Sequence, residues 1–263
     1  MSTPSPWLLL SGTGMVLVAV IGVIIATRSS RSMWRPLAIG ACAWVVAVLL
    51  KVIWAVPTNA IVRQRLLRVA GESLGKPLYW AYIGLLTGVF ECGITLLFIA
   101  RSKLRDADWE RSFAFGMGFG AIEAFVLGFV SLLAMAAVLL FHNFLPPETQ
   151  ARVARDFAGR AEFLPLVLPI FERAATLFIH IFSCVAIIYG FRTRRILIWF
   201  ALAFVYKSAV DGVAAWGIEV LKARESVAAL TKLELLMLPF AIAGLIGLIL
   251  LHKRMEIRVV SPV

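Results

Sequence analysis

Runs of about twenty mostly apolar residues recur along nearly the whole of this 263-residue chain. An α-helix needs about 20 such residues to cross the roughly 30 Å hydrocarbon core of a bilayer, whereas the strands of a membrane barrel alternate over about ten. Charged residues or Pro bound seven runs, at 7–27, 36–56, 78–100, 112–141, 163–191, 196–216 and 233–251. We therefore predict an all-α, polytopic membrane bundle of about seven transmembrane helices that forms a single domain over residues 1–263.

Composition and charge agree with a lipid environment. Hydrophobic residues make up 61% of the chain, against roughly 45–50% in soluble domains. The net charge of +11 would suggest nucleic acid as a partner if the charge formed a patch. Most Lys and Arg instead lie in the short segments between apolar runs, where they face anionic head groups. Membrane lipid is therefore an expected partner and nucleic acid is not.

The distribution of basic residues also predicts the orientation. The segments 28–35, 101–111 and 190–195 and the C-terminal tail are richer in Lys and Arg than the longer segments on the other side. The positive-inside rule then places the N-terminus outside the cell and the C-terminus in the cytoplasm. We expect the membrane to be a bacterial inner (plasma) membrane. The longer outer segments contain the amphipathic stretches IVRQRLLRV and ETQARVARDFAGRAEF. We expect these stretches to form helices that lie in the membrane interface.

Several ionisable side chains lie inside the apolar runs, where each costs at least about 2.5–3.5 kcal/mol on insertion scales. They are Lys51, Glu91, Glu123, Glu172, Arg173, His180, Lys207 and Asp211. Each should face the bundle and have a partner. Any single one can be structural, holding two helices together. Because each of four consecutive runs, from the third to the sixth, contributes at least one of them, we expect them to converge on one polar cavity.

Helical spacing indicates which of these groups share a face. Gly116 and Gly120 form a small-xxx-small pair, and Glu123 follows on nearly the same face, so this helix can approach a neighbour closely and present a carboxyl to it. Lys207 and Asp211 stand at positions i and i+4, which allows a direct ion pair. Glu91 has no opposite charge nearby in the sequence, so its partner must come from another helix.

The sequence argues against a metal or a redox centre. His142 and His252 lie at the ends of apolar runs, which leaves His180 as the one imidazole inside a run, and a catalytic zinc site usually needs about three protein ligands. The three cysteines are isolated within apolar runs, so no disulfide or CxxC motif is indicated. We expect no metal and no other cofactor.

The order of these motifs resembles the YhfC-like branch of the glutamic intramembrane protease superfamily, which also includes the CAAX-processing prenyl proteases and the gamma-secretase scaffold subunit. The similarity covers most of the chain. Residues that match the family pattern are Glu91, the Gly-rich run ending in Glu123, then Glu172, Arg173 and His180, and finally Asp211. The chain departs from the pattern at three positions. Cys92 replaces the second Glu of a Glu-Glu motif, Thr95 replaces an Arg, and Lys207 replaces a second His.

The resemblance implies a hydrolase in which a Glu and a His activate water against a peptide carbonyl. On this pattern Glu91 and His180 would activate the water, and Lys207 and Asp211 would face the oxyanion. Glu123, Glu172 and Arg173 would contribute to binding. The substrate would be a membrane-embedded or lipidated peptide.

The three departures leave two other classes of function open. One is a catalytically silent scaffold or chaperone-like protein that binds a partner helix in the same cavity. The other is a small transporter, against which stands the absence of an inverted repeat in the sequence. No oligomeric state follows from these patterns.

Overall fold

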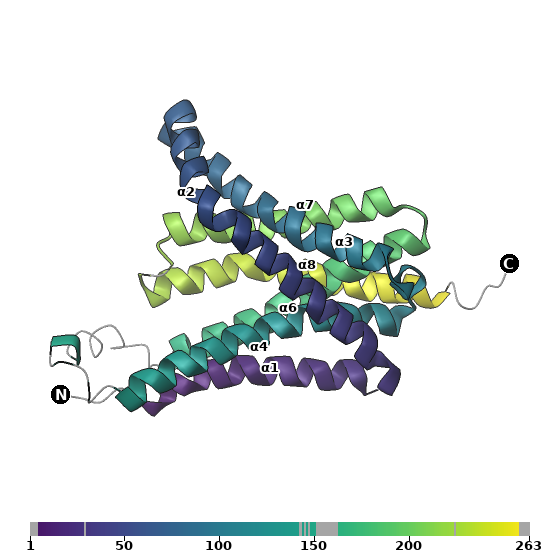
Figure 1. Cartoon of the computed structure of the whole chain (residues 1–263), viewed down its shortest axis with the longest axis horizontal. Helices are drawn as coiled ribbons and strands as arrows, with labels where there is room; N and C mark the ends of the chain where they lie inside the picture. Colours follow the sequence, from purple (N-terminus) through teal and green to yellow (C-terminus); the bar gives the residue numbers. More distant parts are fainter. Residues whose placement is uncertain are drawn as a thin grey trace.

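The computed structural model describes residues 5–28, 30–141, 144, 146, 148–150, 163–223 and 225–257. Over these residues the chain is helical, which confirms the predicted fold class (Figure 1). The main elements are α1 (Leu9–Thr27), α2 (Trp34–Thr87), the π-helical turn η3 (Gly88–Cys92), α3 (Gly93–Ala100), α4 (Trp109–Phe141), α6 (Phe163–Arg192), α7 (Ile196–Val220) and α8 (Val227–Ile257). Short 3-10 turns are η1 (Pro6–Leu8), η2 (Arg31–Met33) and η4 (Lys103–Asp106).

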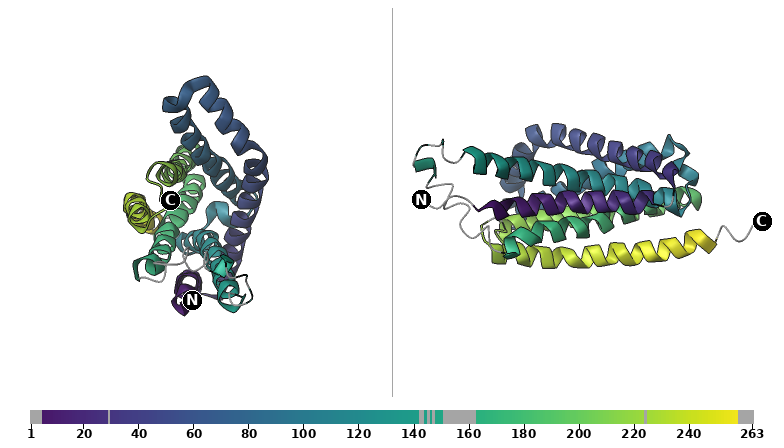
Figure 2. Two further views of the ribbon diagram at one scale, coloured as in Figure 1. Left: turned by 90° about the vertical axis from the view of Figure 1, so that its left-hand side faces the viewer. Right: turned by 90° about the horizontal axis from the view of Figure 1, so that it is seen from below.

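Six helical segments of the described chain are long and apolar enough to cross a membrane. The second, Arg31–Ala100, has 70 residues and as one straight helix would be roughly 105 Å long. The chain instead reverses at Gly71, whose φ of 68° and ψ of 179° break the helical geometry. The predicted runs 36–56 and 78–100 are therefore the two arms of one helical hairpin, whose tip stands clear of the other helices (Figures 1 and 2).

The ends of the bundle bear on the predicted topology. α1 begins at one end of the long axis of the bundle and α8 ends at the other end (Figures 1 and 2). A chain that starts and finishes at opposite ends crosses the bundle an odd number of times, which agrees with the seven predicted runs. Which end faces the cytoplasm stays a prediction. The amphipathic stretch 61–69 prolongs the first arm of the hairpin towards its tip. The second amphipathic stretch, 148–163, lies mostly outside the described residues.

Small residues let the backbones of α2, α4 and α6 approach one another. A Cβ atom on Gly118 would lie 1.9 Å from the carbonyl oxygen of Leu37, so α4 touches the backbone of α2 there. A Cβ on Gly116 would lie 2.8 Å from the Cα of Ile181, and one on Gly120 would lie 2.9 Å from Leu177. The Gly116/Gly120 face of α4 therefore packs on α6, as the small-xxx-small spacing predicts.

Helix α6 is the central helix of the bundle. It packs against α1, α4, α7 and α8, and every residue from Ile179 to Gly190 is buried. In its most apolar 18-residue stretch, 67% of the residues are buried. Such burial is typical of a helix that is hydrophobic on all sides. This burial places the imidazole of His180 inside the protein, away from lipid.

Candidate functional site

The carboxyl of Glu91 enters the bundle from the irregular turn η3. This π-helical turn interrupts the second arm of the hairpin at Gly88–Cys92, and such turns often occur at functional sites. Just before it, a Cβ on Gly84 would lie 2.1 Å from the carbonyl oxygen of Ser208, so the arm packs tightly on α7. As a result the Glu91 side chain is buried, with 5% of its surface exposed.

Two lysines from different helices neutralise Glu91. Lys51, on the first arm of the hairpin, places Nζ 2.7 Å from Oε1 and donates a hydrogen bond to it. Lys207, on α7, places Nζ 2.7 Å from Oε2. This second contact is an ion pair without hydrogen-bond angles, so the buried Oε2 has no hydrogen-bond partner among the described residues. The partners of Glu91 thus come from the other arm of the hairpin and from α7, as the sequence predicted.

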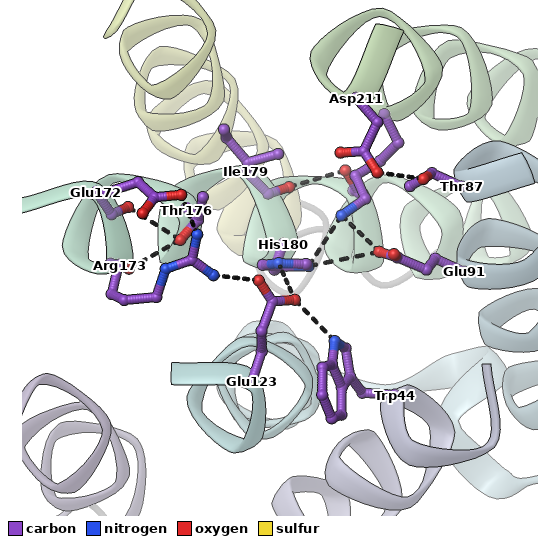
Figure 3. Close-up of polar contacts among 12 residues, drawn as sticks. Trp44, Thr87, Glu91, Glu123, Glu172, Arg173, Thr176, Ile179, His180 and Asp211 are labelled. Atoms are coloured by element: carbon purple, nitrogen blue, oxygen red, sulfur yellow. Dashed lines mark hydrogen bonds and ion pairs between the residues drawn. The ribbon is translucent and has the colours of Figure 1, made fainter. Parts of the chain in front are cut away.

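His180 contacts Lys207 through one ring nitrogen and Glu123 through the other, and Figure 3 shows its ring beside Glu123. Its Nδ1 is 3.0 Å from Lys207 Nζ, and its Nε2 is 3.0 Å from Glu123 Oε2. A charged ammonium only donates, so Nδ1 accepts from Lys207, while Nε2 faces the Glu123 carboxylate. The distance from Nδ1 to Glu91 Oε2 is 4.0 Å. Both ring nitrogens of a neutral imidazole are therefore engaged.

Glu123 gathers three donors on the α4 side of the site. Trp44 Nε1 donates to Oε2 at 2.8 Å, and Arg173 Nη1 donates to Oε1. Arg173 also donates to Glu172, its neighbour on α6 (Figure 3). The carboxyl that the glycine-rich face presents to α6 is therefore fixed by His180 and Arg173, seven residues apart on that helix.

Asp211 is held by the hairpin and not by its own helix. Thr87 donates a hydrogen bond to Asp211 Oδ2, and Lys51 Nζ lies 3.8 Å from the same oxygen. Lys51 also donates to Thr87 Oγ1 at 3.3 Å. The i, i+4 spacing suggested that Asp211 would pair with Lys207, but Lys207 binds Glu91 and His180 instead.

These groups line one cavity of about 680 Å³ between α2, α4, α6, α7 and α8. The predicted site residues on its wall are Glu91, Glu123, Glu172, Arg173, His180, Lys207 and Asp211. Three polar residues of the wall, Trp44, Thr176 and Glu234, were not expected there from the sequence, and Lys51 was expected in the cavity but was given no role in the site. For Lys51 and Glu234 the signal was a charge within an apolar run, whereas Trp44 gave no signal.

The family model described as YhfC intramembrane metalloprotease matches residues 14–231. The chain belongs to the YhfC family. This confirms the resemblance to the YhfC family, and it makes the chain an integral membrane protein of an intramembrane protease family. No curated protein and no solved structure matches the chain.

The family description names a metalloprotease, but the donor set of this YhfC member does not fit a catalytic metal. Zinc in such a site usually has about three protein ligands, and the described residues contain no group of three His, Cys, Asp or Glu that could hold an ion. Both oxygens of Glu91 already face ammonium groups, and both nitrogens of His180 are engaged. The charges of Glu91 are thus balanced by lysines of the protein without an added ion.

Proposed function

We propose that the chain hydrolyses a peptide bond of a membrane-embedded or lipidated peptide, using a water held by Glu91 and His180. The observation that carries the proposal is the meeting of three groups on the cavity wall. Lys207 Nζ lies 2.7 Å from Glu91 Oε2 and 3.0 Å from His180 Nδ1, and these two acceptors are 4.0 Å apart. Because Glu91 Oε2 accepts no hydrogen bond from the described part of the chain, it is an acceptor for a water that enters from the cavity.

The reaction uses the base and the cation in sequence. The carbonyl oxygen of the substrate accepts a hydrogen bond from Lys207, which releases Nδ1 of His180 to orient the water. The water oxygen bonds to the carbonyl carbon while its proton passes to Glu91 Oε2. The ammonium of Lys207 then faces the tetrahedral oxyanion. The proton moves to the leaving nitrogen as the C–N bond breaks, which regenerates the carboxylate.

Lys51 tunes this base without contacting the substrate carbonyl. It holds Glu91 Oε1 at 2.7 Å and is itself fixed by Thr87 and Asp211. A carboxylate that keeps one ammonium partner throughout the reaction is a weaker base than a free one. We therefore expect slow turnover.

The cavity wall supports a peptide within the membrane as the substrate. Away from the charged groups the wall is apolar, with Val126 and Leu127 from α4 and Leu230, Leu233 and Met237 from α8. A volume of about 680 Å³ falls within the roughly 300–1,000 Å³ usual for ligand sites. An apolar segment of a membrane protein or the lipid chain of a modified peptide suits such walls.

The test is cleavage of a fluorogenic transmembrane peptide by protein reconstituted in liposomes. Glu91→Gln should lower kcat by about 10²–10⁴, the usual contribution of a general base. Glu219→Gln is the matched control, because Glu219 pairs with Arg63 and Trp80 away from the cavity, and it should leave kcat unchanged. Equal rates for wild type and Glu91→Gln would contradict the proposal.

The closed ion-pair network favours a second function, a scaffold that binds a partner helix without cleaving it. Both Glu91 oxygens face ammonium groups and both His180 nitrogens have a partner, which is the arrangement expected of polar groups that only hold helices together. In that case wild type cleaves no peptide, while a photo-crosslinkable transmembrane peptide still labels α8 at Met237. Cleavage that Glu91→Gln abolishes would rule the scaffold out.

A further inference from the structure

Two side chains of the cavity converge on one point in the manner of metal ligands. Glu91 Oε2 and His180 Nδ1 are 4.0 Å apart, and a carboxylate oxygen and an imidazole nitrogen are both usual zinc ligands. The point between them is filled by Lys207 Nζ, at 2.7 Å from the oxygen and 3.0 Å from the nitrogen. A cation therefore already stands where these two ligands meet.

The surroundings of His180 strengthen the comparison with a metal site. A ligating histidine nearly always donates its other N–H to a carboxylate or a carbonyl, which orients the ring. Here Nε2 lies 3.0 Å from Glu123 Oε2, and Trp44 fixes the same oxygen at 2.8 Å. His180 thus faces the ammonium group of Lys207 as a ligating histidine faces a metal ion, and Glu123 orients His180 from behind as a carboxylate does in a metal site.

We infer that the ammonium of Lys207 takes the place of a divalent metal ion in this member of a metalloprotease family. The inference stands on the contacts of Glu91, His180 and Lys207, and it holds whether or not the cavity hydrolyses peptides. Lys51 and Lys207 already supply two positive charges to Glu91 and Asp211. An added divalent ion would be buried against these two ammonium groups, so the native protein should bind none at this point.

The geometry also shows how a metal site could be restored. Two tetrahedral ligands at about 2.1 Å from zinc lie roughly 3.4 Å apart, so the present 4.0 Å is only slightly too wide. Lys207→His removes the built-in cation and supplies a third ligand on α7. The restored set is then Glu91, His180 and the new imidazole, with Asp211 one turn further along the same helix.

The test is a Co²⁺ titration of metal-stripped, detergent-purified protein, followed by visible absorption and elemental analysis. Wild type should bind no Co²⁺ in the cavity. Lys207→His should bind one equivalent with the spectrum of four-coordinate Co²⁺, at least about 100-fold tighter than wild type, since even losing an outer-shell partner costs 10–100-fold. The double variant Lys207→His/His180→Ala should lose this binding, whereas His252→Ala in the Lys207→His background should keep it.

Two results would overturn the inference. One is a stoichiometric Co²⁺ or Zn²⁺ site in wild type that His180→Ala removes, because a metal would then coexist with Lys207. The other is a folded Lys207→His protein that binds no Co²⁺. If that variant does not fold, the wild-type titration still decides, together with Lys207→Ala, which opens the same point and should bind Co²⁺ more tightly than wild type. Since the readout is metal binding, failure of peptide cleavage leaves this test unaffected.

Discussion

Replacing Lys207 by Met should destabilise the protein much more than replacing a surface lysine with the same ion-pair distance. Lys207 and Glu91 are each 5% exposed and 2.7 Å apart. Lys76 and Glu72 are also 2.7 Å apart, but they are 36% and 80% exposed. Breaking a buried pair costs about 3–5 kcal/mol, because one charge is left without a partner. The exposed i, i+4 pair is screened by water and contributes little.

The contacts of Glu91 indicate how much stability Lys207→Met should lose. Lys51 still holds Oε1 of Glu91 after Lys207 is removed, so the loss should lie near the lower limit, at about 3 kcal/mol. The double variant Lys207→Met/Glu91→Leu removes both charges and leaves Lys51 with Asp211 and Thr87. It should recover about 2 kcal/mol relative to the sum of the two single losses, since apolar replacement of a whole buried pair is often nearly neutral.

Equilibrium unfolding in mixed micelles of detergent and SDS measures these differences, with the fluorescence of the eight tryptophans as the signal. Lys76→Met is the matched control and should leave the free energy of unfolding nearly unchanged, because water screens the pair that it breaks. The reasoning is refuted if Lys207→Met is no more destabilising than Lys76→Met. It is also refuted if the losses of the two buried single variants simply add in the double variant.

Three glycine substitutions test the close packing and the hairpin by the same unfolding measurement. Gly118→Ala should cost about 1–3 kcal/mol or more, because its Cβ would lie 1.9 Å from the backbone oxygen of Leu37; a neutral result would mean that α2 and α4 are not in contact. In Gly71→Ala the added Cβ has open space, but alanine is strained at a φ of +68°. The free energy of unfolding should fall by about 1–3 kcal/mol, and a stabilised variant would contradict the reversal at Gly71. Gly93→Ala, helical and with nothing within 4 Å, should be neutral or stabilising by up to about 1 kcal/mol.

The sequence was sufficient for the helical bundle because the length of an apolar run is a local property. Each predicted run lies within a helix of the structure. The Gly116/Gly120 face was also predictable, since small residues at i and i+4 make one side of a helix flat. The continuous helical hairpin was not, because Pro57 and Pro77 suggested interruptions and the chain turns at Gly71 instead.

The membership of the site was more predictable than its pairing. A charged side chain that faces lipid costs several kcal/mol of insertion free energy, so the convergence of the charges on one cavity could be expected from the sequence. Which cation meets which carboxylate depends on how helices distant in sequence are placed. The i, i+4 spacing of Lys207 and Asp211 predicts an ion pair only for an isolated helix. In the bundle, Lys207 contacts Glu91 and Asp211 contacts Thr87. Trp44 was not predictable, because an indole within an apolar run has no distinguishing signal.

The helical hairpin has a consequence for how the chain enters the membrane during synthesis. Lys51 stands on the first arm and Glu91 on the second, and their charged atoms are 2.7 Å apart. Two unpaired charges at mid-bilayer would cost roughly 5–7 kcal/mol on insertion scales. Since the turn at Gly71 brings the two arms together, the translocon can release them into lipid with Lys51 and Glu91 already paired. The lysine of α7 emerges from the ribosome later and finds the carboxylate already in place.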